Sequence, residues 1–353
     1  MLSAIDEAAA IEHLHEIGAT DGLPVIVPTT DRVERLVLAS GLDPDIELGE
    51  MGPGYGIATV EKVATAAVMA GCLPDVVPVV VAAVRAICQP EFDLTEMQCT
   101  THCIAPMIVV GGPVARDCGF VGSFGLMGPG HRANATVGRA LRLCMMNIGG
   151  ARPGESDMAI HGSPAKFGFC FTEDIESSPF ASLHTSLGYQ PEQSAVIVLG
   201  VEGPHSALFT GEADDRDSAL RILDTLAAVI ANRGSNNVTL GGFAAVAVVL
   251  NPEHADILAR HGFDRATIQS ELAARAVLPR EVLLAQNPKM LKGDEALIPA
   301  VRDPANILLM VGGAPGLYSM VMPSWCAGPH GNVFVHSEVE LNQFCELPTV
   351  SAG

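Results

Sequence analysis

The chain has 353 residues, of which 48% are hydrophobic and 17% are charged, so it encodes a folded globular protein with a sizeable core. Its formal net charge of −20 argues against binding to nucleic acid or to an anionic membrane surface, because both repel an acidic protein. No run approaches the roughly 18 apolar residues of a transmembrane helix, and the acidic start lacks a signal-peptide pattern. With nine cysteines expected as reduced thiols, these features predict a cytoplasmic protein.

Helical and strand patterns alternate along the chain. Helices are predicted at 3–17, 32–40, 75–88 and 217–233, from Thr59 onward, and from Asn251-Pro252; strands are predicted at 25–27, 107–110, 195–199 and 307–311, and within 238–250. This alternation predicts the α/β class, built from repeated strand–Gly/Pro loop–helix units. The strands at 107–110, 195–199 and 307–311 each run into a Gly/Pro loop, so we expect these loops at one edge and two related halves.

The two halves are expected to have different roles. Residues 1–210 form an N-terminal half that carries the site, and residues 211–353 form a C-terminal half. Within the latter, residues 277–304 are expected to be irregular, and the tail from Cys326 is expected to add an edge strand. His254 lies beside a predicted helix and is expected at the surface.

A glycine-rich loop that enters a helix is the first candidate for ligand binding. The loop contains Gly128, Gly130, His131 and Arg132, and Asn134 is expected to be the N-cap of the helix. Free backbone N–H groups and the helix dipole favour an anion at such a position, and a guanidinium can hold a carboxylate with two hydrogen bonds. We therefore predict a cradle for a small anion; the alternative is an ordinary loop before an ordinary helix.

Cysteine and histidine side chains lie just before the strand at 107–110. His102 stands between Cys99 and Cys103, an arrangement suited to nucleophilic catalysis by a thiolate, and Cys118 is a further thiol candidate. The alternatives are inert buried thiols, a hydrogen-bonded core histidine, or a divalent metal held by His and Cys, although the spacing is not that of a zinc ribbon.

Downstream residues supply further charged candidates. The chain has only 20 basic residues, so Arg152 and Lys166, lying among glycine loops, point with Arg132 to an anionic ligand. Glu173 follows an apolar segment and is a candidate general base, and His205 follows a Gly-Pro pair near another strand end. A solvated acidic turn is the alternative for Glu173 and its neighbours Asp174 and Glu176.

Several phrases, in order, resemble those of the UGSC proteins, a bacterial family named for a selenocysteine- or Cys-Gly-Ser-Cys segment. They include Thr100-Thr-His-Cys-Ile-Ala-Pro, Gly128-Pro-Gly-His-Arg-Ala-Asn, Gly162-Ser-Pro-Ala-Lys-Phe and Glu202-Gly-Pro-His, within residues 20–320. The resemblance marks His102, Arg132, Asn134, Lys166, Glu173 and His205 as positions that fit the family phrases. This chain lacks the Cys-Gly-Ser-Cys segment itself.

These patterns favour an enzyme that acts on a small anionic, carboxylate-bearing substrate by acid–base or Cys-assisted chemistry of the lyase or hydratase type. The alternatives are a hydrolase of a C–N bond, a thiol-redox or metal-thiolate protein, and a non-enzymatic binding subunit. No cofactor is required by the sequence. A homodimer or another homo-oligomer is expected for a bacterial-type enzyme of this size.

Overall fold

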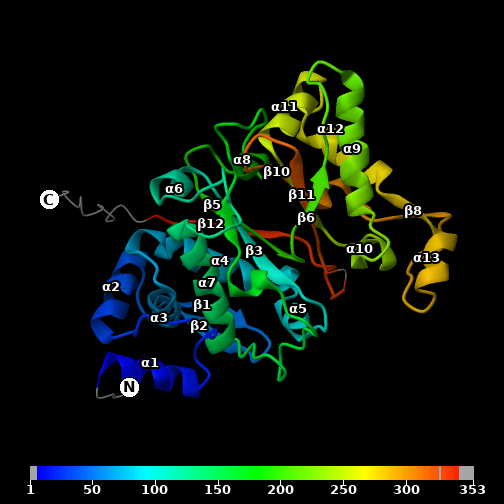
Figure 1. The fold of residues 1–353 in the computed structure, drawn as a ribbon. Helices are drawn as coiled ribbons and strands as arrows, with labels where there is room; N and C mark the ends of the chain where they lie inside the picture. Colours follow the sequence, from blue (N-terminus) through cyan, green and yellow to red (C-terminus); the bar gives the residue numbers. More distant parts are fainter. Residues whose placement is uncertain (1–5, 326, 342–353) are drawn as a thin grey trace.

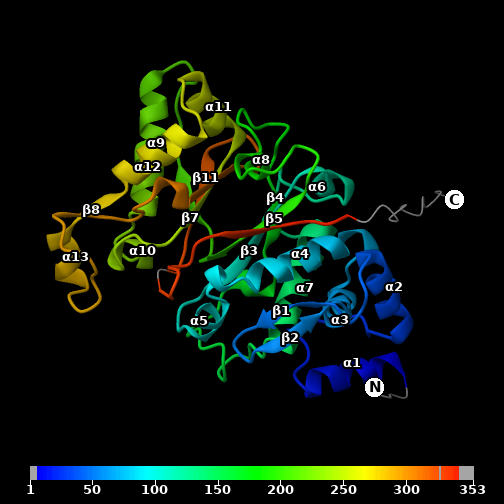
Figure 2. The ribbon, with the colours of Figure 1, turned by 180° about the vertical axis from the view of Figure 1, so that it is seen from behind.

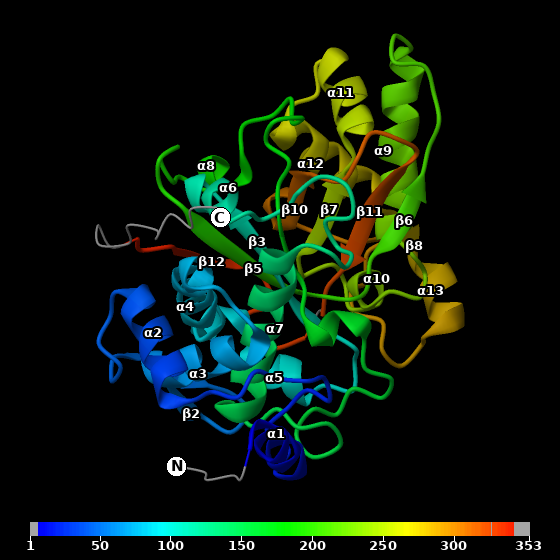
Figure 3. The ribbon, with the colours of Figure 1, turned by 60° about the vertical axis from the view of Figure 1, so that its left-hand side comes forward.

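The structure is a computed structural model that describes residues 6–325 and 327–341. Two four-stranded mixed sheets form its centre, and helices cover the outer face of each sheet (Figures 1 and 3). The first sheet has the order β12-β5-β3-β4, with strands Val335–Glu338, Ala195–Val201, Ala105–Gly111 and Cys170–Thr172. The second has the order β10-β7-β11-β6, with strands Ile307–Val311, Val246–Leu250, Tyr318–Pro323 and His205–Leu208. The predicted α/β class is confirmed.

The two faces of strand β3 pack against two different parts of the hydrophobic core. Neighbouring residues of a strand point to opposite faces, so Ile108 and Val110 pack with the N-terminal helices, whereas Met107 and Val109 belong to the core shared with the second sheet. The helices on the outer face are α2 (Thr30–Ser40), α3 (Val60–Ala70), α4 (Val77–Ile87) and α7 (Arg132–Asn147).

The second sheet repeats this arrangement on its own side. Val246 and Val248 of β7 pack with the C-terminal helices, whereas Ala247 and Val249 belong to the core shared between the sheets. Those helices are α9 (Arg216–Ile230), α11 (Pro252–Arg260) and α12 (Arg265–Arg275). The molecule is therefore a sandwich of four layers, helices–sheet–sheet–helices.

Each half of the chain contributes one edge strand to the sheet of the other half. β6 follows β5 in the sequence but pairs with β11, and β12 follows β11 but pairs with β5. Figure 2 shows the segment of β12, in red, running alongside the N-terminal half of the molecule. A boundary at residue 210 therefore does not divide the two sheets.

The three strands expected to carry their loops at one edge do not do so. β3 and β5 are antiparallel neighbours with Gly111 opposite Ala195, so the loops that follow them lie at opposite edges of the first sheet. β10 belongs to the second sheet. The pattern of an apolar strand followed by Gly and Pro is the same whichever way the strand runs in its sheet. The pattern therefore predicted the strands but not their orientation.

The remaining elements are short. They are α1 (Glu7–Glu16), the hairpin of β1 (Glu47–Met51) and β2 (Gly56–Thr59), α5 (Leu94–Cys99), α6 (Pro113–Asp117), α8 (Leu183–Ser186), α10 (Asn236–Thr239), α13 (Arg280–Gln286), the hairpin of β8 (Val277–Pro279) and β9 (Leu297–Pro299), and 3-10 turns at Pro74–Val76, Pro90–Phe92, Pro164–Phe167 and Pro304–Asn306. Within the described residues, no helix has the length and apolar character needed to cross a membrane.

Two predicted elements are wrong. Residues 25–27 form no strand, because Ile26 N–H bonds to the carbonyl of Met69 at the end of α3 instead of to a neighbouring strand. Residues 277–304 are not irregular throughout, since they contain a hairpin and α13. The predicted edge strand of the tail is confirmed as β12, whereas Cys326 and residues 342–353 lie outside the described residues.

His254 is not at the surface as expected, and its burial leads to a prediction about pH. Nδ1 of its ring lies 2.8 Å from Oγ of Ser319, and burial lowers the pKa of His254. An unfolded chain binds this proton near pH 6.5, while the folded chain does not, so stability falls as the pH drops below that value.

We therefore expect His254→Gln to weaken the loss of stability between pH 7 and pH 5, by up to about 1.4 kcal/mol per pH unit. Urea unfolding of both proteins at several pH values measures the two slopes. Equal slopes would contradict the prediction, whatever the absolute stability of the variant.

Candidate functional site

His102 connects the two halves of the chain. Its Nε2 lies 3.0 Å from Oε1 of Glu202, and its Nδ1 lies 2.9 Å from the amide nitrogen of Asn236. An amide NH₂ donates hydrogen bonds, so Nδ1 accepts and Nε2–H donates to the carboxylate. Glu202 belongs to the N-terminal half and Asn236 to the C-terminal half, so the ring of His102 bridges the two halves.

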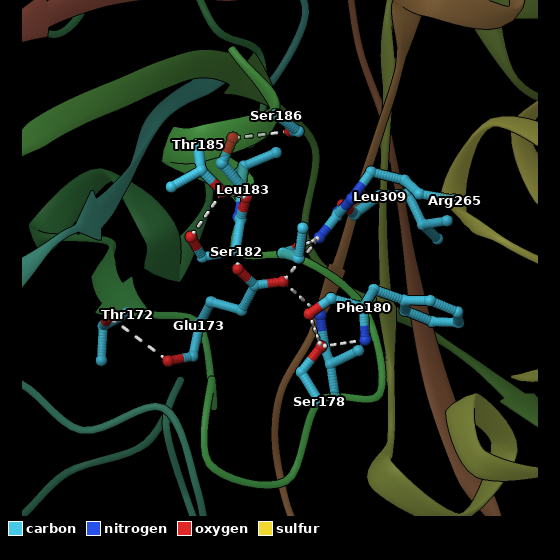
Figure 4. Close-up of polar contacts among 12 residues, drawn as sticks. Thr172, Glu173, Ser178, Phe180, Ser182, Leu183, Thr185, Ser186, Arg265 and Leu309 are labelled. Carbon is cyan, nitrogen blue, oxygen red and sulfur yellow. Dashed lines mark hydrogen bonds and ion pairs between the residues drawn. The ribbon is translucent and has the colours of Figure 1, made fainter. Parts of the chain in front are cut away.

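Glu173 follows β4 directly, as predicted, but both oxygens of its carboxylate already accept hydrogen bonds within the protein (Figure 4). Oε2 accepts a hydrogen bond of 2.6 Å from Leu183 N–H, and Oε1 accepts bonds from Arg265 Nη2 at 3.1 Å and from Val311 N–H at 3.2 Å. These donors come from α8, α12 and β10. Glu173 therefore ties the end of β4 to the second sheet and its helices.

His205 lies elsewhere again. It is exposed on β6, opposite Val321 of β11, and it lines a separate cavity together with Asp224 and Arg275. The three residues predicted to transfer protons thus occupy three different places in the fold.

The predicted anion cradle has a different local structure. α7 begins at Arg132 and its N-cap is His131, so the prediction of Asn134 as the N-cap is wrong. Asn134 is buried: Oδ1 accepts from Val121 N–H, and Nδ2 donates to the carbonyls of Val121 and Leu126. Its amide therefore fastens the preceding loop to the helix.

The other cradle residues face outward or bind backbone. Arg132 is exposed and donates from Nη2 to the carbonyl of Gly71 at 3.1 Å, and His131 Nε2 lies 3.1 Å from the carbonyl of Phe124. Gly128 and Gly130 are exposed. Among the described residues, Arg132 and His102 share no hydrogen bond or ion pair.

The cysteines differ in their surroundings. Cys118 packs against the N-terminal core, and its Sγ donates to the carbonyl of Asp75. Cys99 is exposed at the end of α5, and burial of its sulfur, followed by the charges of Glu96 and Asp157, raises the pKa of its thiol. A raised pKa disfavours the thiolate needed for nucleophilic chemistry. Cys103 is half-buried and lies close enough to Lys166 to influence that residue electrostatically.

Lys166 belongs to a group of three largely buried charges that lines a cavity. Its Nζ donates to both carboxylate oxygens of Asp157, at 2.6 and 2.8 Å, and Arg142 Nη2 donates to Asp157 Oδ2 at 2.9 Å. Arg142 also donates to Gln98 Oε1 at 3.1 Å, which links α7 to α5. Two cations therefore share one buried carboxylate.

These side chains line a cavity of about 750 Å³, which we name the Lys166 cavity. It lies between the turn after α1, the middle of α7 and the loop that leads to the 3-10 turn at Pro164–Phe167. Its charged lining residues are Asp21, Arg142, Arg152, Glu155, Asp157 and Lys166. The neighbouring segment of Cys99 and Cys103 joins this region, because Ile160 N–H bonds to the carbonyl of Thr101.

The Lys166 cavity has a cation at its wall without a carboxylate partner among the described residues. Its lining contains three cations and three carboxylates, but Asp21 is paired with Arg139, which lies outside the lining, at 2.7 and 2.8 Å. Arg142 and Lys166 share Asp157. Arg152 donates to the carbonyl of Gly18, and no carboxylate of the described chain pairs with it. In a chain with a net charge of −20, a guanidinium at a cavity wall without a carboxylate partner favours an anionic ligand.

The protonation equilibria of the buried pair are shifted. Burial lowers the pKa of Lys166, and the nearby charge of Arg142 lowers it as well, against the opposing effect of Asp157. Burial alone would raise the pKa of Asp157, but the hydrogen bonds and charges of Lys166 and Arg142 hold that pKa below its ordinary value. A lysine of this kind reaches its neutral, nucleophilic form more readily than an exposed lysine does.

Sequence reasoning found Lys166 and Arg152 but missed Arg142. The signal was present, because Arg142 stands between Leu141 and Leu143 on a helix whose other side chains here are buried and apolar. Charged residues are rarely buried without a partner, so an arginine in such a run predicts a buried anion nearby.

In the described part of the chain, no group of three or more His, Cys, Asp or Glu side chains is arranged to hold a metal ion. Comparisons with protein-family models, with curated proteins and with solved structures found no match. The resemblance to the UGSC proteins therefore stays a prediction.

Proposed function

We propose that the protein is an enzyme of the lyase or hydratase type that binds a small carboxylate-bearing substrate in the Lys166 cavity. The observation that carries this proposal is the group of three cations at the cavity wall, of which two share one carboxylate and the third, Arg152, has none. A planar guanidinium matches a carboxylate with two parallel hydrogen bonds. Arg152 is thus the residue proposed to hold the substrate anion.

Lys166 and Asp157 are the proposed proton-transfer pair. Their contacts of 2.6 and 2.8 Å allow a proton to pass between Nζ and the carboxylate. Neutral lysine is a base that can remove a proton from the carbon beside a carboxylate or carbonyl group, and lysinium returns it to the product. Elimination and addition of water both require such an exchange.

The rim of the cavity suggests what the rest of the substrate resembles. Ile160 is 72% exposed and Phe167 is 50% exposed, and both line the cavity together with Met146. Large apolar side chains at a pocket mouth gain free energy when a ligand covers them. We therefore propose that the substrate carries a short hydrocarbon part beside its carboxylate.

Calorimetric titration with a panel of short-chain carboxylates tests the proposed binding. We expect at least one to bind, and we expect Arg152→Gln to weaken that binding about 10- to 100-fold, since a hydrogen bond to a charged group contributes roughly 1.5–3 kcal/mol. Arg116→Gln is the matched control, because Arg116 is exposed and lies outside the cavity. The binding assignment fails if Arg152→Gln and Arg116→Gln bind the carboxylate as tightly as the unaltered chain.

A further inference from the structure

Lys166 differs from every other lysine of the chain. The sequence contains four lysines, and Lys62, Lys289 and Lys292 are all exposed. The side chain of Lys166 is largely buried, lines a cavity and contacts a carboxylate that also binds a guanidinium. A buried amine beside a second cation is the usual setting of a lysine that forms covalent intermediates.

We propose that Lys166 Nζ is a nucleophile that forms an imine with a small 2-oxo acid. This inference rests on the proposed function and deepens it, because it names the substrate class. In such an acid the reactive carbonyl carbon is bonded directly to the carboxylate. A substrate anchored by its carboxylate therefore presents the carbonyl close to the anchor, and Lys166 and the two arginines line one cavity.

The step balances with the groups present. Asp157 takes a proton from lysinium, and the free electron pair of Nζ attacks the carbonyl carbon. The second proton lost by Nζ passes to the resulting alkoxide oxygen, which gives a neutral carbinolamine. The C–O bond then breaks, the oxygen leaves as water with a proton returned by Asp157, and a protonated imine remains. No oxidant or reductant takes part.

The lowered pKa of Lys166 and the guanidinium of Arg152, which no carboxylate of the described chain pairs with, support this chemistry for two separate reasons. The first increases the fraction of neutral amine at neutral pH, and the second attracts the carboxylate of the oxo acid. The imine also acidifies the neighbouring C–H bond, which suits a reaction of the lyase type.

Borohydride trapping tests the inference. The protein is incubated with pyruvate, 2-oxobutyrate or 2-oxoglutarate, sodium borohydride is added as the external reductant, and peptides are mapped by mass spectrometry. The expected result is one reduced adduct on Lys166 in most of the chains, dependent on the oxo acid and absent in Lys166→Arg. Lys289→Arg is the control and retains the adduct, since Lys289 is exposed and lies outside the cavity.

The peptide map keeps the test valid even where Lys166→Arg fails to fold, because it compares four lysines in the unaltered chain. An adduct spread equally over the exposed lysines, or no adduct with any of the three oxo acids, overturns the imine. Binding of carboxylates that depends on Arg152, found without an adduct, would overturn the imine and leave the proposed function standing. If no carboxylate binds, the proposed function itself fails.

Discussion

Asp157→Asn is expected to lower the free energy of unfolding by about 3–5 kcal/mol, because breaking a buried ion pair leaves a charge without compensation. Here two buried cations, Lys166 and Arg142, depend on the same carboxylate. Asparagine has nearly the same shape, so the loss reports charge and hydrogen bonding and not packing. The loss should be smaller at pH 9 than at pH 7, since Lys166 can then give up its proton.

Urea unfolding at both pH values measures this loss. Asp117→Asn is the matched control: its pair with Arg116 is exposed, and exposed pairs contribute about 0–1 kcal/mol. A stability change for Asp157→Asn no larger than that of Asp117→Asn would contradict the view that the charges at the cavity wall are held by this carboxylate.

Glu173→Gln is expected to cost a similar amount, about 3–5 kcal/mol, for a different reason. The carboxylate accepts from two backbone N–H groups and from Arg265, whereas an amide offers one oxygen and two hydrogens. In the variant, the NH₂ group of glutamine therefore faces at least one of these N–H donors inside the protein, and that donor loses its acceptor. Because those donors lie on α8, α12 and β10, the change weakens the contact between the sheets at the end of β4.

Chemical unfolding followed by fluorescence, with Glu176→Gln as the control, measures this effect. Glu176 is exposed three residues further along the chain, so its change should be within about 0.5 kcal/mol. An unchanged free energy of unfolding for Glu173→Gln would contradict this structural role of Glu173.

Most of the elements could be predicted from the sequence, because their signals are local. The strand at Ile307–Val311 and the helix opened by Asn251-Pro252 were predicted at the observed positions, and the side chain of Asn251 accepts from His254 N–H as a capping residue should. The local pattern does not specify the direction of a strand in the sheet or the strand with which it pairs. Nothing local distinguishes an edge strand that pairs within its own half of the chain from one that pairs with the other half, as β6 and β12 do.

The same distinction explains the candidate site. Lys166 and Arg152 were predicted because basic residues are scarce, and the structure places both at one cavity. Arg132 satisfied the same criterion but lies ten residues before Arg142 on α7, about 15 Å along the helix, and binds backbone instead. Scarcity of a residue type selects candidates, whereas their grouping depends on contacts between distant segments, such as that of Ile160 with Thr101.

The exchange of edge strands has a consequence for how the protein is made. A ribosome releases the chain from its N-terminus, and domains generally fold as units while synthesis continues. Here β12, the edge strand of the first sheet, cannot pair with β5 until residues 335–338 have emerged. One edge of β5 therefore stays without a hydrogen-bonding partner until then. Such an unpaired strand edge invites association between chains. Nascent molecules of this protein are therefore expected to depend on chaperone binding until β12 has emerged and paired with β5.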